Sequence, residues 1–226
     1  MLCQLLTSKV RERWQNKALK MQFDTAFQQS CGIPIQTFPP EERAFVEAEY
    51  AKHKVLLEYG SGGSTLLAAQ QDHPLVMTVE NDKTWAQNMT QTLAQLYPDA
   101  PVKIHWVDTG PTKAWGHPRT NGAERGWRNY PKYALNIWDQ PFFRHPDLIL
   151  IDGRFRTACF MTALMRIERP VTVLFDDYAN RRRYHWIERH ASVQEMIGRM
   201  AKFRLQPTQW NAKDLTRILT AFLDPD

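Results

Sequence analysis

The sequence predicts a doubly wound α/β fold, in which helices cover both faces of a mostly parallel sheet. Two observations carry this prediction. Five short apolar runs each end in an acidic residue, and segments with apolar residues at helical spacing separate these runs. Nearly continuous apolar runs are typical of strands that are buried on both faces, as in a parallel sheet. Their alternation with helices indicates βαβ units.

The predicted elements follow one another from residue 38 onward. FPPEERAFVEAEYA has proline at its start and acids in its first turn, which favours a helix and closes a helical segment over residues 1–50. The predicted strands are VLLE (ending at Glu58), LVMTVE (Glu80), VKIHWVD (Asp108), LILID (Asp152) and VTVLFDD (Asp176 and Asp177). The predicted crossover helices are STLLAAQQ, KTWAQNMTQTLAQLY and RTACFMTALMRIE.

After the fifth strand, RYHWIERHASVQEMIGRM is predicted to be helical, and AKFRLQ and TRILTAFL to form a terminal strand pair. The sheet would then have seven strands. A length of 226 residues suits a single domain over residues 1–226. No apolar run approaches the roughly 20 residues that span a bilayer, and the apolar part of the N-terminus is too short for a secretory signal. We therefore expect a cytoplasmic protein.

One connection between strands is longer than the others. Asp108 and Asp152 lie 44 positions apart, whereas the other successive strand ends are separated by 22 to 28. The inserted segment, 109–146, leaves the carboxyl end of a strand, where doubly wound sheets bind ligands. Its aromatic residues, Trp115, Trp127, Tyr130, Tyr133 and Trp138, alternate with cationic residues such as His117. They would form either a lid that stacks on a planar or sugar-like acceptor, or a self-packed aromatic cluster.

The turn after the first strand reads LLEYGSGGST and is rich in glycine. Glycine allows the backbone to turn sharply and to approach a ligand closely. Glu80, at the end of the next strand, can accept both hydrogen bonds of a ribose diol. Thr65 stands where a nicotinamide-dinucleotide fingerprint has glycine, and the lysine of a nucleoside-triphosphate loop is missing. The loop therefore matches neither of these two fingerprints.

This loop resembles motif I of the class I S-adenosylmethionine-dependent methyltransferases, (D/E)xGxGxG. The matching residues are Glu58, Gly60 and Gly62, with Ser64 in place of the third glycine. The resemblance implies that Gly60, Ser61 and Gly62 line the methionine part of S-adenosylmethionine. It also implies that Glu80 binds the ribose and that Asp108, or the neighbouring Thr109, lies near the adenine.

Three carboxylates are expected to meet beside this loop. In a doubly wound sheet the first and fourth strands are neighbours and the fifth follows the fourth, with about 4.8 Å between adjacent strands. Asp152, Asp176 and Asp177 should therefore share one small space. Such a cluster needs a cation, a proton or an arginine, because like charges raise each other's pKa. An oxygen-rich site suits Mg²⁺, Ca²⁺ or Mn²⁺.

LILIDG and VLFDDY are similar to the ligand set of metal-dependent O-methyltransferases of the catechol, caffeoyl-CoA and macrocin types. This resemblance implies that Asp152, Asp176 and Asp177 bind a metal such as Mg²⁺ and that Asp152 also acts as the catalytic base. The sequence departs from those enzymes after Asp152, where it reads Gly-Arg-Phe-Arg. Either Arg154 or Arg156 could therefore neutralise the cluster instead of a metal. Residues 40–180 also resemble bacterial methyltransferase-like proteins with no assigned substrate.

Together these patterns predict a methyltransferase that acts on a hydroxyl of a small molecule or glycan precursor. Arg154, Trp115, Trp127 and Tyr130 are the candidate substrate contacts, and Arg181, Arg182 and Arg183 could hold an acidic group. The net charge of +5 leaves RNA or DNA methylation as an alternative. A protein that keeps the fold without catalysis is a second alternative.

Overall fold

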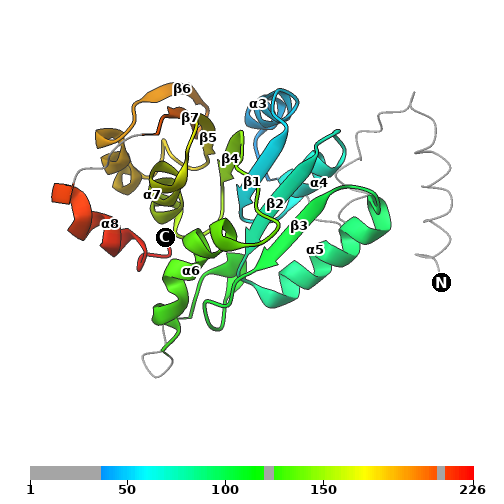
Figure 1. Cartoon of the computed structure of the whole chain (residues 1–226), viewed down its shortest axis with the longest axis horizontal. Coiled ribbons are helices and arrows are strands. Elements are labelled where there is room, and N and C mark those ends of the chain that lie inside the picture. The colour runs from blue at the N-terminus through cyan, green and yellow to red at the C-terminus, as the bar shows by residue number, and fades with distance from the viewer. Residues whose placement is uncertain (1–36, 120–124, 208–211) are drawn as a thin grey trace.

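The computed structural model describes residues 37–119, 125–207 and 212–226 (Figure 1). Within them, seven strands form one sheet in the order β3-β2-β1-β4-β5-β7-β6. The strands are β1 (Val55–Tyr59), β2 (Leu75–Glu80), β3 (Val102–Trp106), β4 (Leu148–Ile151), β5 (Val171–Phe175), β6 (Val193–Ile197) and β7 (Met200–Leu205). β1 to β5 are parallel, and β7 is antiparallel to β5 and β6. This order confirms the predicted doubly wound fold.

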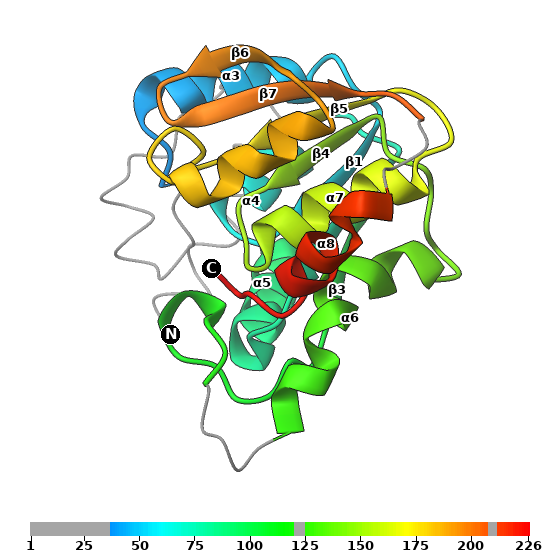
Figure 2. The same ribbon diagram turned by 90° about the vertical axis from the view of Figure 1, so that its left-hand side faces the viewer.

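Helices cover both faces of the sheet. The α-helices are α3 (Pro40–Tyr50), α4 (Gly63–Ala69), α5 (Lys83–Leu96), α6 (Tyr130–Leu135), α7 (Arg156–Arg166) and α8 (Leu215–Ala221). The 3₁₀ helices are η1 (Ala114–Gly116), η2 (Arg125–Asn129), η3 (Asn136–Asp139), η4 (Arg182–Arg189) and η5 (Ala212–Asp214). α6, α7 and α8 lie side by side (Figure 2), whereas α4 and α5 share the apolar cluster of Leu66, Met89 and Leu93.

The alternation of side chains along the central strands explains this layering. Leu57 and Tyr59 of β1 point into the core that contains α6, α7 and α8. Leu56, which precedes them on the strand, packs in the cluster that contains α3. β4 and β5 are buried at every position, as strands covered on both faces must be. The carboxyl ends of β1, β2, β4 and β5 consequently meet at one edge of the sheet.

The C-terminal part of the fold differs from two predictions. Residues 183–200 do not form one helix, because η4 ends at Arg189 and β6 begins at Val193. A tight turn at Gly198, whose φ is +54°, joins β6 to β7. TRILTAFL is not a strand: it lies largely in α8, where Ile218 and Ala221 are buried at helical spacing. AKFRLQ matches β7, but its partners are β5 and β6.

Two further predictions concern the ends of elements. β3 ends at Trp106 instead of Asp108, so Asp108 is an exposed residue of the loop that follows the strand. The helix expected after residue 38 is confirmed as α3. Residues 1–36 of the expected N-terminal helical segment lie outside the described residues. Among the described helices, none combines the length and apolar character required to cross a membrane.

Candidate active site

The glycine turn after β1 lies against the turn after β4. The amide of Gly60 donates to the carbonyl of Val79, and the amide of Asp152 donates to the carbonyl of Tyr59 at 3.0 Å. Gly60 has φ +101°, and a Cβ atom at this position would lie only 2.9 Å from the backbone of Gly153. The two turns therefore touch through backbone atoms, and glycine is required on both sides of the contact.

Glu58 holds this turn in place through hydrogen bonds. Its carboxylate is fully buried and accepts hydrogen bonds of 2.6 Å from the hydroxyls of Tyr50 and Thr65. Burial raises the pKa of Glu58. Thr65 in turn accepts a bond from the amide of Gly62, and Ser64 is buried beside it in α4. Glu58 and Ser64 thus belong to the base of the loop, where they fix its shape.

Glu80, at the end of β2, contacts the loop through Ser61. One carboxylate oxygen accepts from the hydroxyl of Ser61 at 2.9 Å and from its amide at 3.3 Å. The other oxygen accepts from the amides of Asn81 and Asp82, both at 2.8 Å. Burial raises the pKa of Glu80, and these hydrogen bonds oppose the rise. The structure therefore brings Glu80 and Ser61 together.

Asn81 is a site residue that the sequence prediction missed. Its side-chain amide donates to the hydroxyl of Thr109 and to the carbonyl of Gly116, both at 2.8 Å. These bonds hold the start of the insertion over the end of β2. Asp108 does not join them, because it is exposed and accepts a local hydrogen bond from the amide of Gly110. The side chain after Glu80 was the available clue, since polar residues at strand ends line ligand sites.

The three aspartates meet as predicted. Ile151 of β4 pairs with Phe175 of β5, so the residues that follow each strand are adjacent. Arg156 inserts between them: one guanidinium nitrogen, Nη2, is 3.2 Å from carboxylate oxygens of both Asp152 and Asp177. Its Nη1 also donates to the backbone carbonyl of Asp176. The side chain of Arg156 is only 4% exposed.

A second arginine enters the cluster from the turn between β6 and β7. The Nε atom of Arg199 lies 3.1 Å from a carboxylate oxygen of Asp176 and 3.0 Å from one of Asp177. Arg181 adds a bond of 2.8 Å to Asp177. Arg154 does not contact these acids; its charged contact is with Asp226. Of the two arginines considered for this role, Arg156 therefore neutralises the cluster, and the assignment to Arg154 is wrong.

The arrangement does not fit a divalent cation. Among the residues of the described ranges, no group of three or more His, Cys, Asp or Glu side chains is placed to hold a metal ion. The carboxylate oxygens that would be ligands instead face guanidinium nitrogens of Arg156, Arg181 and Arg199. The arginines thus supply the positive charge that the acidic cluster requires.

Comparison with solved structures identifies the family of this chain. A methyltransferase-like protein from Silicibacter pomeroyi is 41% identical to this chain, with a TM-score of 0.80. The match covers 85% of this chain and 99% of that protein. The chain belongs to the family of this methyltransferase-like protein, and its fold is that of the class I S-adenosylmethionine-dependent methyltransferases. No family model and no curated protein matches the chain of this methyltransferase.

More distant structures share the fold of the methyltransferase. One is the O-methyltransferase of tomaymycin synthesis from Streptomyces achromogenes, solved with S-adenosylmethionine. It is 16% identical and has a TM-score of 0.56, over 87% of this chain and 98% of its own. Another is an O-methyltransferase from Bacillus cereus in complex with S-adenosylhomocysteine. It is 15% identical and has a TM-score of 0.54, over 85% and 94%.

The aromatic residues of the insertion divide into two groups in this methyltransferase. Tyr130, Tyr133 and Trp138 are buried in the main core, and the ring of Tyr130 lies 5.1 Å from that of Phe155. Trp115 and Trp127 are 80% and 53% exposed. The first group matches the predicted self-packed alternative in being buried. Its residues pack in the main hydrophobic core instead of in a separate cluster. Only the second group is available to contact an acceptor.

The charge state of Asp152 follows from its surroundings in the methyltransferase. Loss of hydration raises the pKa of Asp152 well above its ordinary value, Arg156 opposes this rise, and the neighbouring Asp176 adds to it. The side chain still keeps 29% of its exposure, so Asp152 is the least buried of the three aspartates. It is therefore accessible to an acceptor and holds a proton more firmly than an ordinary aspartate.

Proposed function

We propose that this methyltransferase transfers a methyl group from S-adenosylmethionine to a hydroxyl oxygen of a small molecule or glycan precursor. The observation that carries the proposal is the backbone contact between Gly60 and Gly153, because it places the cofactor loop directly beside the turn that bears Asp152. The two distant neighbours named as O-methyltransferases support an oxygen acceptor.

The residues of the loop have distinct roles in the proposed cofactor site. Gly60, Ser61 and Gly62 would line the methionine part, since their backbone is free of obstructing side chains. Glu80 would accept hydrogen bonds from the ribose diol, which would replace its bond from the Ser61 hydroxyl. Glu58 and Ser64 would act through the loop that they support. Thr109, which is buried and held by Asn81, is better placed than Asp108 to border the adenine.

Asp152 is the proposed general base. S-adenosylmethionine, when bound, supplies a methyl group that is already activated on a sulfonium sulfur. Asp152 would take the hydroxyl proton as the acceptor oxygen receives the methyl group, and S-adenosylhomocysteine would be the leaving group. Its raised pKa favours this transfer, because a more basic carboxylate binds the proton more tightly. Arg156, 3.2 Å away, would keep the carboxylate oriented.

The proposed reaction requires no magnesium ion. The arginine contacts favour the arginine-neutralised alternative over the metal set of Asp152, Asp176 and Asp177. Trp115 and Trp127 remain the proposed stacking residues of a lid that residues 109–146 would form. Tyr130 would support that lid from the core. A single domain over residues 1–226 and a cytoplasmic location remain predictions from the sequence.

Replacing Glu80 with alanine tests the cofactor assignment. We expect the variant to bind S-adenosylhomocysteine about 100-fold more weakly than the wild type, because hydrogen bonds to a charged group contribute about 1.5–3 kcal/mol and tenfold corresponds to about 1.4 kcal/mol. Isothermal titration calorimetry measures this affinity. Absence of binding by the wild type, or equal binding by both proteins, would refute the proposed function.

Two further variants make this result specific. Glu80→Gln retains one oxygen acceptor toward Ser61, so it separates loss of charge from collapse of the loop. Glu47→Ala removes an exposed glutamate of α3 and should leave affinity unchanged. Thermal unfolding of each variant shows whether the fold is intact.

The raised pKa of Asp152 predicts a pH dependence of stability. The folded chain binds this proton more tightly than the unfolded chain, so the stabilisation is complete below the ordinary aspartate pKa of about 3.9. It is lost as the pH rises through the raised pKa. Relative to Asp152→Asn, the wild type should therefore lose unfolding free energy as the pH rises above about 4. Urea denaturation at successive pH values measures this difference, and parallel curves for the two proteins would contradict it.

A further inference from the structure

Two arginines and one histidine from separate parts of the chain surround the carboxylate of Asp226. Oδ1 of Asp226 lies 3.3 Å from Nε2 of His117 and 3.6 Å from Nη1 of Arg154. Its Oδ2 lies 3.7 Å from Nη1 of Arg183. His117 belongs to the insertion, Arg154 follows β4, and Arg183 lies in η4. These elements therefore meet around a single anionic group.

The carboxylate of Asp226 is held loosely. Its distances to the three side chains all exceed the 2.7–2.9 Å that is typical of charge-assisted hydrogen bonds. The side chain is 43% exposed. The backbone adds one contact nearby, from the amide of Phe155 to the carbonyl of Pro225 at 3.3 Å. A carboxylate in this position can be replaced without breaking a strong network.

Arg154 lacks the hydrogen bonds that a buried guanidinium requires. Its side chain is 14% exposed, and its Nε atom is buried without a hydrogen-bond partner among the residues that the structure describes. Burial and the nearby Arg156 lower the pKa of Arg154. A guanidinium has five donors in a fixed fork that matches a carboxylate. A ligand with closer oxygen atoms would satisfy Arg154 better than Asp226 does.

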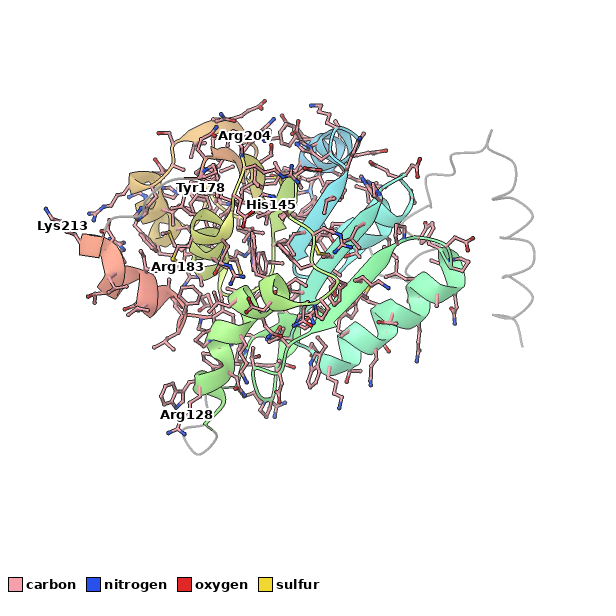
Figure 3. The ribbon with its side chains drawn as sticks, viewed as in Figure 1. Arg128, His145, Tyr178, Arg183, Arg204 and Lys213 are labelled. Carbon is pink, nitrogen blue, oxygen red and sulfur yellow. The ribbon has the colours of Figure 1, made fainter. Side chains whose placement is uncertain are left out.

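The arginines around the acidic cluster have different partners. Arg156, Arg181 and Arg199 are paired with the three aspartates of the cluster. Arg154 and Arg183 face Asp226 instead, and Figure 3 shows Arg183 near α7, in the region where the C-terminus lies in Figure 1. Arg154 is only two residues from Asp152. A group bound there would place the rest of its molecule beside the candidate base.

We propose that His117, Arg154 and Arg183 bind a carboxylate group of the acceptor, and that Asp226 occupies this subsite when the acceptor is absent. The proposal rests on the proposed function, because it assigns the substrate class of the same site. It restricts the acceptor to hydroxylated molecules that also carry a carboxylate. Asp226 then competes with the acceptor for the same three side chains.

Succinate, a simple dicarboxylate, is the probe for this subsite. We expect the Nε–Hε resonance of Arg154 in ¹⁵N NMR spectra to shift at about tenfold lower succinate in Asp226→Asn than in the wild type, since an internal competitor reduces apparent affinity. Sodium chloride keeps the ionic strength constant. Arg183→Gln should weaken succinate binding, whereas Arg182→Gln, at an exposed neighbouring arginine, should not.

Each outcome of these titrations is decisive. Equal midpoints in the wild type and Asp226→Asn, or unchanged binding in Arg183→Gln, would overturn the proposal. Tighter binding of inorganic phosphate than of succinate would overturn the assignment to a carboxylate. Titration of each variant with S-adenosylhomocysteine separates the two proposals: cofactor binding without a succinate response removes only the subsite, and a succinate response without cofactor binding removes only the proposed function.

Discussion

Replacing Arg156 with methionine should lower the free energy of unfolding by about 3–5 kcal/mol, because removal of one partner leaves buried charges uncompensated. Arg156 contacts all three aspartates of the cluster and donates to the carbonyls of Asp152 and Gly153. Methionine preserves much of the side-chain volume, so the loss measures charge and hydrogen bonding more than packing. Urea denaturation at neutral pH gives the value.

Arg166→Met is the matched control for this prediction, because it lies on the same helix. Its side chain is 38% exposed and pairs with Asp139, which is 60% exposed. Surface pairs of this kind contribute about 0–1 kcal/mol. A similar loss in both variants would show that the acidic cluster does not depend on Arg156.

Arg156→Met also tests the magnesium alternative. In the wild type, neither Mg²⁺ nor a chelator should change the unfolding free energy, because arginines already neutralise the acids. In Arg156→Met the oxygen atoms become free for a hard cation. Mg²⁺ at about ten times its dissociation constant would then add about 1.4 kcal/mol. Stabilisation of the wild type by Mg²⁺ would show that the arginines do not exclude a metal.

Gly153→Ala should disrupt the contact between the cofactor loop and the turn after β4. A Cβ atom at Gly153 would overlap the hydroxyl of Tyr133 and approach the amide of Gly60 to 2.9 Å. Overpacking of this kind typically costs about 1–3 kcal/mol of stability. Because the loop must move, we also expect S-adenosylhomocysteine to bind more weakly to this variant than to the wild type.

Gly62→Ala provides the comparison for stability. A Cβ atom at Gly62 meets no other atom within 4 Å, and its φ of 174° is extended backbone that any residue adopts. Its unfolding free energy should remain within about 0.5 kcal/mol of the wild type. If both variants lose the same stability in chemical denaturation, close packing of the two turns is not the reason for glycine at residue 153.

The parallel part of the sheet could be predicted because its pattern of apolar residues is compatible with only one arrangement of strands. Apolar runs such as LILI and VTVLF require burial on both faces, and the switch in strand order then brings Asp152 next to Asp176. The C-terminal hairpin could not be predicted in the same way. The apolar residues of 193–200 fit helical and strand spacing alike, and pairing with β5 through β7 decides between them.

The spacing of residues in the sequence also could not show which arginine neutralises the acidic cluster. Arg154 and Arg156 follow Asp152 closely, and either side chain has the length to reach it. Phe155, between them, adopts φ +52°, which is unusual for a large side chain, and it is fully buried. This bend directs Arg156 toward the aspartates and Arg154 toward Asp226. Packing of Phe155 on Tyr130 and Tyr133 accompanies the bend.

Arg199, in the turn between β6 and β7, links segments that lie far apart in the sequence. The amide of Arg199 donates to Glu42 of α3 at 2.7 Å, across 157 positions of sequence, while the guanidinium of Arg199 contacts Asp176. Contacts of such separation form slowly, since a long segment must be ordered before they close. The acidic cluster therefore acquires its full complement of cations only when the last hairpin docks. Without this hairpin, Asp176 and Asp177 lack the cation that Arg199 supplies, so the charge balance of this edge of the sheet depends on segments from both halves of the described residues.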